Sequence, residues 1–468
     1  MSFKYLKEHN LEEPRMIAII EGTGSGTKLL QSLLDSHPEV CMIPGYALMY
    51  FYPYWEEYIT KKKINDWAIV LESVINTFSS IFDTSINPGS ETLDQLGENQ
   101  DESLSVDIDK FRSFFLLFTK GESVTAKNSL IAIHYAYAYA TGESLSTKKA
   151  IVYHIHVFFY AKKYLYRDFP NLQVIAAIRD QRANIRKRVQ NSIIKPNQTK
   201  LRDSDEFLMR QTAYRHIIRF TSEGLDSLSP ISRDKVRVFK HEDLVTRLEQ
   251  VMLNLAQFLN IEFTNSLLKP TWGGLVWQTT YYDFDSKASV ANPSVLSKDW
   301  VHLQSPIEIF FIEGLSYDSI KEYYGNLMYY KKNTFSNVLT TIFLSLIPRP
   351  IEMKYFFQLL RVDKYMAIVF RETQDIQSLR SYQNNLFYSL KWTNSGINFA
   401  KLDILRLANK PVNLNNSKLL RTGYFLSRII SYALALASIP VNYGLRVLTS
   451  FSVIKRRVSS TRLLPEVL

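Results

Sequence analysis

A loop rich in glycine and hydroxyl side chains lies near the start of the chain, between an apolar run and an amphipathic segment. Residues 16–20 predict a buried strand, and leucines recur at helical spacing from Leu29 to Leu34. The first N–H groups of such a helix point at whatever sits above the loop, and the helix dipole favours an anion there. A tight connection without a ligand is the alternative. The loop consists of Gly22, Thr23, Gly24, Ser25, Gly26, Thr27, Lys28 and Leu29.

The order of residues in this loop bears on which anion it binds. A nucleotide-hydrolysing P-loop has Lys followed by Ser or Thr, because that hydroxyl binds magnesium. Here Thr27 precedes Lys28 and Leu29 follows it. The loop therefore favours a phosphate or sulfate group without an evident metal ligand, and it counts against an ATPase or a kinase.

A second cationic group follows another apolar run, residues 172–178, which ends on Arg179. A guanidinium offers a planar fork to phosphate oxygens, and ligands of open α/β sheets collect at the carboxyl ends of the strands. Arg179 is therefore predicted to bind phosphate. A solvated basic helix face through Arg182, Arg186, Lys187 and Arg188 is the alternative, and it applies mainly to the last three.

Two histidines lie on a third strand-like run, residues 150–157. His154 and His156 are separated by one residue, so both side chains point to the same face of a strand. An imidazole with a pKa near about 6.5 can take a proton from an attacking hydroxyl at neutral pH. The pair could equally bind a metal or be hydrogen-bonded core residues. The sequence offers no third metal ligand at motif spacing.

Taken together, these segments resemble the sulfotransferases that use 3′-phosphoadenosine 5′-phosphosulfate (PAPS). Residues 22–38 resemble the family's 5′-phosphosulfate loop, and 172–182 resemble its 3′-phosphate signature. Residues 235–244 and 294–325 resemble two later family elements, so the likeness covers roughly residues 14–330. The implied fold is α/β, with a central parallel sheet, flanking helices and a P-loop-like architecture.

The resemblance also implies roles for individual residues. His156 takes the place of the general base, while His154 takes the place of a lysine. Lys28 and His154 would stabilise charge on the sulfuryl oxygens. Lys187 stands where the family has a serine, and Lys298 lies in a loop that would close over the phosphates. The reserve candidates for the base are Glu39, Glu56, Glu57 and His134.

Two departures from the family pattern favour a second hypothesis. Gly24 stands where the family has a basic residue, and Lys187 replaces the serine. Either the cation has moved along the loop to Lys28, or activity is impaired. The main hypothesis is a sulfotransferase that moves a sulfuryl group from PAPS to a hydroxyl of a carbohydrate, lipid or small molecule. It releases 3′,5′-adenosine bisphosphate and needs no metal. The alternative is a non-catalytic, membrane-associated protein that keeps the fold.

Two regions lie outside the implied α/β core. Residues 51–147 are predicted to form a helical insert whose aromatic side chains either line the acceptor pocket or fill space between helices. Residues 331–468 are predicted to be a basic, amphipathic and mostly helical C-terminal region. The clustered aromatic residues of the insert are Tyr50, Phe51, Tyr52, Tyr54, Trp55 and Tyr58.

The C-terminal region holds most of the chain's formal net charge of +11. Residues 401–468 have eleven Lys and Arg residues against two acidic ones. The uncharged stretch 429–445 is shorter than the ~20 residues of a spanning helix, so it fits an interfacial helix beside an anionic membrane. Packing on the protein itself or on a second subunit is the alternative. The dispersed charge lacks a nucleic-acid-binding pattern.

The start of the chain and its cysteine content predict a location. The polar opening lacks the apolar core of a signal peptide. Cys41 is the only cysteine, so no intrachain disulfide can form. A protein of the cytoplasm, or of the cytoplasmic face of a membrane, is therefore expected.

Overall fold

A computed structural model describes residues 3–20, 25–45, 48, 51–85, 92–155, 164–184, 233–278, 301, 306–332, 334–346 and 467–468. Internal contacts divide the chain into two compact units. Among the described residues, those up to 179 together with 233–278 and 467–468 belong to the first unit, and 180–184, 301 and 306–346 belong to the second. No helix in the described ranges is long and apolar enough to cross a membrane.

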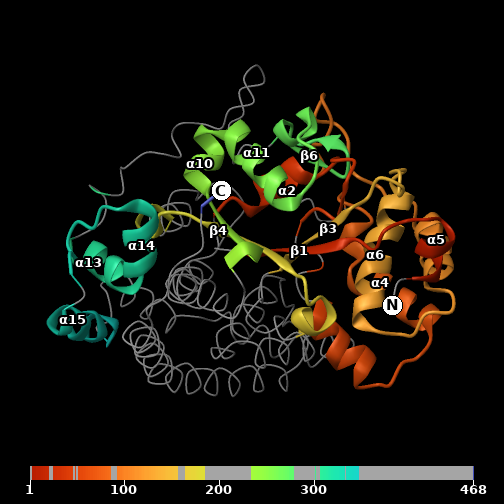
Figure 1. The fold of residues 1–468 in the computed structure, drawn as a ribbon, viewed down its shortest axis with the longest axis horizontal. Coiled ribbons are helices and arrows are strands. Elements are labelled where there is room, and N and C mark those ends of the chain that lie inside the picture. Colours follow the sequence, from red (N-terminus) through yellow and green to blue (C-terminus); the bar gives the residue numbers. More distant parts are fainter. Residues whose placement is uncertain are drawn as a thin grey trace, which may run out of the picture. The chain divides into compact units, whose positions relative to one another are not determined.

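The described part of the first unit contains a five-stranded parallel sheet (Figure 1). Its order is β2-β3-β1-β4-β5, so the central strand β1 has β3 on one side and β4 on the other. Parallel pairing needs a crossover between successive strands, and the strands are almost wholly buried, as their continuous apolar runs predict. The strands are β1 (Arg15–Ile20), β2 (Val40–Met42), β3 (Ala150–Ile155), β4 (Gln173–Ile178) and β5 (Val236–Lys240).

One face of this sheet packs against two amphipathic helices, α2 (Thr27–Leu34) and α11 (Leu248–Leu259) (Figure 1). The leucines of α2 are buried against Ile17 and Ile19 of β1 and against the apolar side of α11. Burying a leucine side chain contributes about 1.5–3 kcal/mol, so this face anchors the helix that follows the glycine-rich loop. The short helix α10 (His241–Thr246) follows β5 directly.

The described residues between 51 and 147 contain six helical elements and no strand. Three of these helices begin at capping side chains: Asp66, Asp107 and Thr125 accept hydrogen bonds from backbone N–H groups of the first turn. The elements are α3 (Phe51–Tyr54), the π-helix η2 (Trp55–Thr60), α4 (Trp67–Thr77), the 3₁₀ turn η3 (Ser79–Ile81), α5 (Ile108–Thr119) and α6 (Ala126–Ala140).

The aromatic cluster of this insert is core. Phe51, Tyr52, Tyr54 and Trp55 are buried. The ring of Tyr52 stacks on Tyr164, and the rings of Tyr54 and Phe78 meet edge to face. Of the two roles that the sequence left open, these four side chains have the packing role.

Smaller elements complete the first unit. The antiparallel hairpin of β6 (Thr271–Trp272) and β7 (Leu275–Val276) turns at Gly273 and Gly274. Leu468 donates a backbone hydrogen bond to Val238 O at the outer strand β5. The remaining elements are α1 (Lys4–Glu8), η6 (Arg233–Lys235) and η7 (Asn265–Leu268).

The described part of the second unit is helical. Its helices are α13 (Pro306–Leu315), α14 (Tyr317–Tyr324) and α15 (Phe335–Leu346). A buried carboxylate, Glu313, organises the turn that follows α14: it accepts hydrogen bonds from the backbone N–H groups of Met328, Tyr329 and Tyr330. The N–H groups of that buried turn are thereby satisfied.

These observations confirm the predicted α/β class and the central parallel sheet. β2 was not predicted. Most of the C-terminal region, including 401–466, lies outside the described residues, so its predicted helices and membrane segment stay predictions.

Candidate functional site

The carboxyl edge of the sheet brings together the segments that carry the predicted chemistry. Ile20, the last residue of β1, is in register with Ile155 of β3 and with Ala176 of β4. The chain therefore leaves these three neighbouring strands at the same edge. The loop before α2, the end of the histidine strand and Arg179 all follow from there, and all belong to the first unit.

The described part of the loop has the shape of an anion-binding corner. Gly26 has a φ of 82°, which glycine adopts without strain, and it caps α2 with its carbonyl accepting from Leu30 N. Ser25 is buried, and its Oγ makes no hydrogen bond within the described chain. A buried hydroxyl in that state costs free energy unless a ligand satisfies it, so Ser25 fits a bound oxyanion. Gly22, Thr23 and Gly24 lie outside the described residues.

The first residues of α2 have distinct roles. Thr27 and Leu29 are buried, and Leu29 packs in the core between the helix and the sheet. Lys28 is half-buried and lies one residue into the helix, beside the N–H groups that α2 leaves without intrahelical partners. An anion at this end would meet both the helix dipole and the Lys28 charge.

His154 lies on β3 next to the central strand, in register with Ile19. Side chains alternate along a strand, so His154 shares a face with Ala150 and Val152, the residues that pack with α2. It is buried. The histidine therefore lies on the side of the sheet that carries the loop. His156, the predicted base, follows the last residue of β3 and lies outside the described residues.

Arg179 follows β4 directly and is only 7% exposed. Burying a guanidinium so fully is costly unless it is paired with hydrogen-bonding or charged groups. Its place beside the end of β1 is the place that the sequence predicts for a phosphate ligand. Lys187 and Lys298, the other predicted nucleotide ligands, lie outside the described residues.

The structure adds His241 to this group, a residue that the sequence analysis did not single out as functional. His241 is the first residue of α10, and it is buried. Its ring lies against the backbone of Gly26: a Cβ placed on Gly26 would come within 2.4 Å of His241 Nδ1. The available signal was its position immediately after a predicted strand, where residues reach the carboxyl edge.

Two of the reserve bases lie elsewhere. Glu39 precedes β2 at the opposite, amino edge of the sheet, where it pairs with Lys149 and accepts from Glu262 N. His134 is buried within α6, with Nδ1 hydrogen-bonded to Leu130 O, and burial lowers its pKa to about 4. Neither residue lies beside the loop. Glu56 lies on η2, and the side chain of Glu57 is not described.

Arg182, three residues after Arg179, is buried in the second unit. Its guanidinium pairs with Asp180 at 2.8 Å and with Glu313 at 2.9 Å. Burial is the largest single influence and lowers the pKa of Arg182. The hydrogen bonds and charges of Asp180 and Glu313 together outweigh burial, so the pKa of Arg182 is raised. The predicted solvated basic face therefore does not include Arg182.

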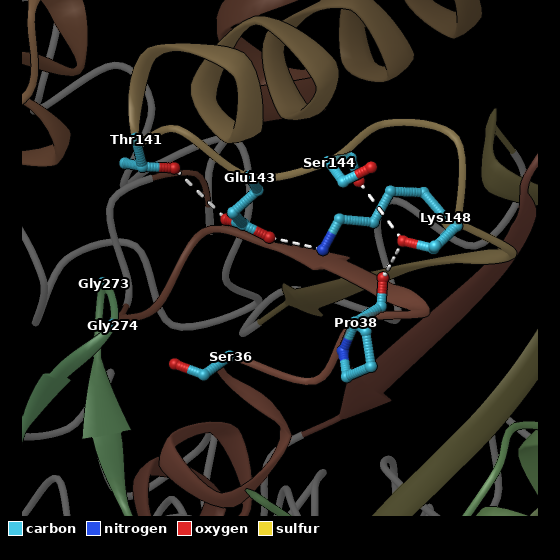
Figure 2. A pocket seen from close by; sticks show the side chains of 9 residues that line it. Ser36, Pro38, Thr141, Glu143, Ser144, Lys148, Gly273 and Gly274 are labelled. Atoms are coloured by element: carbon cyan, nitrogen blue, oxygen red, sulfur yellow. Dashed lines mark hydrogen bonds and ion pairs between the residues drawn. The ribbon is translucent and has the colours of Figure 1, made fainter.

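A cavity of about 280 Å³ is lined by residues that precede β2, residues that precede β3 and the turn between β6 and β7 (Figure 2). The ammonium group of Lys148 is buried there, where it donates to Val40 O at 2.6 Å and pairs with Glu143. The Thr141 hydroxyl donates a hydrogen bond to Glu143 (Figure 2). The Thr147 hydroxyl donates one to Pro38 O. These polar groups form hydrogen bonds and an ion pair within the protein, so no ligand is needed to explain them.

The model of a family described as the sulfotransferase family matches residues 22–265, more than half of the chain. A comparison with curated protein sequences finds no match.

Among solved structures, the chain is similar to the sulfotransferase domain from the curacin biosynthetic pathway, with 15% identity over 71% of this chain and 98% of that one and a TM-score of 0.32. It is similar to the sulfotransferase domain of the Synechococcus PCC 7002 olefin synthase, with 13% identity over 71% and 96% of the two chains and a TM-score of 0.32. A sulfotransferase from Mycobacterium avium matches with 13% identity over 56% and 69% and a TM-score of 0.31.

Proposed function

The chain belongs to the sulfotransferase family, and from that premise we propose that it transfers a sulfuryl group from PAPS to the hydroxyl of an acceptor. The observation that carries this proposal is the convergence of the loop before α2 and Arg179 at the carboxyl ends of neighbouring strands. A nucleotide with phosphates at both the 3′ and 5′ positions needs two separate anion sites, and the loop before α2 and Arg179 are the two candidates at this edge.

The residues at the edge suit PAPS in a particular orientation. The N-terminus of α2, Ser25 and Lys28 would hold the 5′-phosphosulfate, since they combine backbone donors, a buried hydroxyl and a charge. Arg179 would hold the 3′-phosphate through its planar fork of donors. PAPS, when bound, supplies the sulfuryl group and leaves as 3′,5′-adenosine bisphosphate.

The chain's own residues would then move one proton and stabilise charge. The imidazole of His156 takes the proton of the acceptor hydroxyl while the acceptor oxygen bonds to sulfur and the bond from sulfur to the 5′-phosphate oxygen breaks. Lys28 and the α2 N-terminus stabilise the negative charge that develops on the sulfuryl and phosphate oxygens. His154, buried on β3 on the side of the sheet that carries the loop, completes this cationic environment when protonated.

Calorimetry with 3′,5′-adenosine bisphosphate tests the proposal directly. We expect binding in the absence of magnesium, because the site offers backbone N–H groups and cations to both phosphates. ATP in the presence of magnesium is the control, since tighter binding of that ligand would indicate a kinase. Lack of binding by either nucleotide would indicate a scaffold and would contradict the proposal.

A second assay separates catalysis from binding. Slow release of sulfate from labelled PAPS without an acceptor is expected of an active site that positions water in place of the acceptor hydroxyl. A protein that binds the bisphosphate but hydrolyses PAPS no faster than the uncatalysed background rate would be a nucleotide-binding protein without catalytic activity.

A further inference from the structure

An exposed surface with aromatic, aliphatic and basic side chains lies around the start of α15 in the second unit. Phe335 is 78% exposed, Leu339 is 47% exposed and Tyr329 is 43% exposed. Phe335 and Leu339 are four residues apart on one helix, so they lie on the same side of it. Single exposed apolar residues are common, but here three of them occur within eleven residues of the chain.

The other side of α15 is packed. Thr341 is fully buried, and a Cβ on Gly314 of α13 would meet Thr341 Oγ1 at 2.5 Å. Tyr330 is buried too, with its ring against those of Phe310 and Tyr317. The helix is therefore held on α13 by one side, and the exposure of Phe335 and Leu339 is a property of the opposite side.

Two cations lie four and three residues before Phe335 in the chain. Lys331 and Lys332 are exposed, and neither forms an ion pair with a residue that the structure describes. They precede the N-terminus of α15, where the helix dipole disfavours positive charge, so helix stability does not explain them. The stretch 326–350 contains no Asp or Glu.

We propose that the α15 face, defined as Tyr329, Lys331, Lys332, Phe335 and Leu339, docks on an anionic lipid surface. Apolar side chains enter the boundary between headgroups and acyl chains, and lysines beside them meet the negative surface potential. A second copy of the chain fits less well, because pairing this face with itself would bring like charges together in a chain of net charge +11. The inference is independent of the proposed enzymatic activity.

Vesicle sedimentation of the full-length chain tests this surface. The probe is vesicles of phosphatidylcholine and phosphatidylserine at roughly 7 to 3, compared with phosphatidylcholine alone. We expect the wild type to sediment with the anionic vesicles. The double variant Phe335→Ser/Leu339→Ser should weaken that binding about tenfold or more, since it removes two insertable side chains. Lys331→Glu/Lys332→Glu should weaken it by a similar factor and reduce its dependence on salt.

Matched controls come from exposed apolar residues of the first unit. Ile69 is 51% exposed and Leu117 is 53% exposed, so Ile69→Ser/Leu117→Ser removes comparable apolar surface elsewhere. This control should bind vesicles like the wild type. Equal binding by wild type and Phe335→Ser/Leu339→Ser would overturn the proposal and assign any membrane affinity to residues 401–468. Concentration-dependent dimerisation that the α15 variants abolish, without vesicle binding, would also overturn it in favour of a second copy.

Discussion

Gly26 lies directly against the imidazole of His241, so close that a single added carbon on Gly26 would come within 2.4 Å of Nδ1. The contact joins the loop after the central strand to the residue after the outer strand β5. Both residues are buried. The positive φ of Gly26 and the flat ring above it together fix the direction in which α2 begins.

Gly26→Ala should therefore weaken the binding of 3′,5′-adenosine bisphosphate. A left-handed conformation costs an alanine about 1–2 kcal/mol, and the clash with His241 adds to that cost. Gly142→Ala is a matched control, because Gly142 has a φ of 83° but nothing within 4 Å of its Cβ position. Titration calorimetry should show weakened binding for Gly26→Ala and normal binding for Gly142→Ala.

The double variant Gly26→Ala/His241→Ala provides the second arm of that test. Removing the ring removes the clash, so part of the lost stability should return relative to Gly26→Ala alone. Thermal unfolding measures that recovery. If the stability lost in the double variant equalled the sum of the losses in Gly26→Ala and His241→Ala, there would be no steric coupling between the two residues.

Arg179→Ala should weaken the binding of 3′,5′-adenosine bisphosphate about 10- to 100-fold, the usual loss when a charged hydrogen-bonding partner is removed. It should leave the affinity for adenosine 5′-monophosphate nearly unchanged, because that ligand lacks the 3′-phosphate. Lys28→Ala should weaken both ligands. Calorimetry with the two nucleotides distinguishes these patterns, and an equal loss for both in Arg179→Ala would refute the assignment of Arg179 to the 3′-phosphate.

His156→Ala should lower turnover about 10²- to 10⁴-fold, the usual contribution of a general base, with bisphosphate affinity retained. The control is His9→Ala, because His9 is exposed at the C-terminal end of α1. Sulfate transfer from labelled PAPS is the measurement. Unchanged turnover would remove His156 from the mechanism and leave His154 to be tested in the same way.

The sequence predicted the elements of the site because each has a strong local signal. Runs of apolar residues before the loop, before Arg179 and around His154 identify buried parallel strands, and the leucine spacing identifies α2. Family resemblance added the order of these segments. That their ends meet at one edge is then a consequence of parallel pairing around β1.

The sequence could not supply contacts between distant segments. His241 and Gly26 are brought together by the strand order, which local periodicity does not encode. Glu39 looked available as a carboxylate near the loop in sequence, yet β2 begins immediately after it, at the opposite edge of the sheet. The three-residue length of β2 explains why it was missed, since so short a run carries little periodic signal.

Asp35 should make stability depend on pH in an unusual direction. Burial raises its pKa from 3.8 to about 6, although Thr271 Oγ1 and Gly274 N donate hydrogen bonds to Oδ2. Because the folded-state pKa is raised, its contribution is fully present below the unfolded value and is lost as pH rises to about 6. The loss amounts to about 3 kcal/mol for a shift of this size.

Asp35→Asn isolates this effect, since an amide oxygen can accept the same two hydrogen bonds and does not titrate. The unfolding free energy of the wild type relative to Asp35→Asn should fall between pH 4 and 6 and stay level above that range. Asp107→Asn is a comparison in which the pH dependence of stability has the opposite sign. The pKa of Asp107 is lowered, chiefly by the hydrogen bond from Lys110 N in the first turn of α5. A flat difference for Asp35→Asn over this range would contradict the prediction.

Glu313→Ala should destabilise the second unit more than any exposed ion-pair change. Its carboxylate accepts from Arg182 and from three backbone N–H groups, so its removal leaves a buried guanidinium without one of its partners and should cost about 3–5 kcal/mol. Glu72→Ala, which breaks the exposed pair with Arg112, should cost less than about 1 kcal/mol. Hydrogen exchange of peptides from residues 306–330 reports the local effect.

The double variant Arg182→Met/Glu313→Gln removes both charges of the buried ion pair. The same peptides should exchange more slowly in this variant than in Glu313→Ala. Faster exchange in the double variant would show that the unpaired charge of Arg182 is not the cause of the destabilisation.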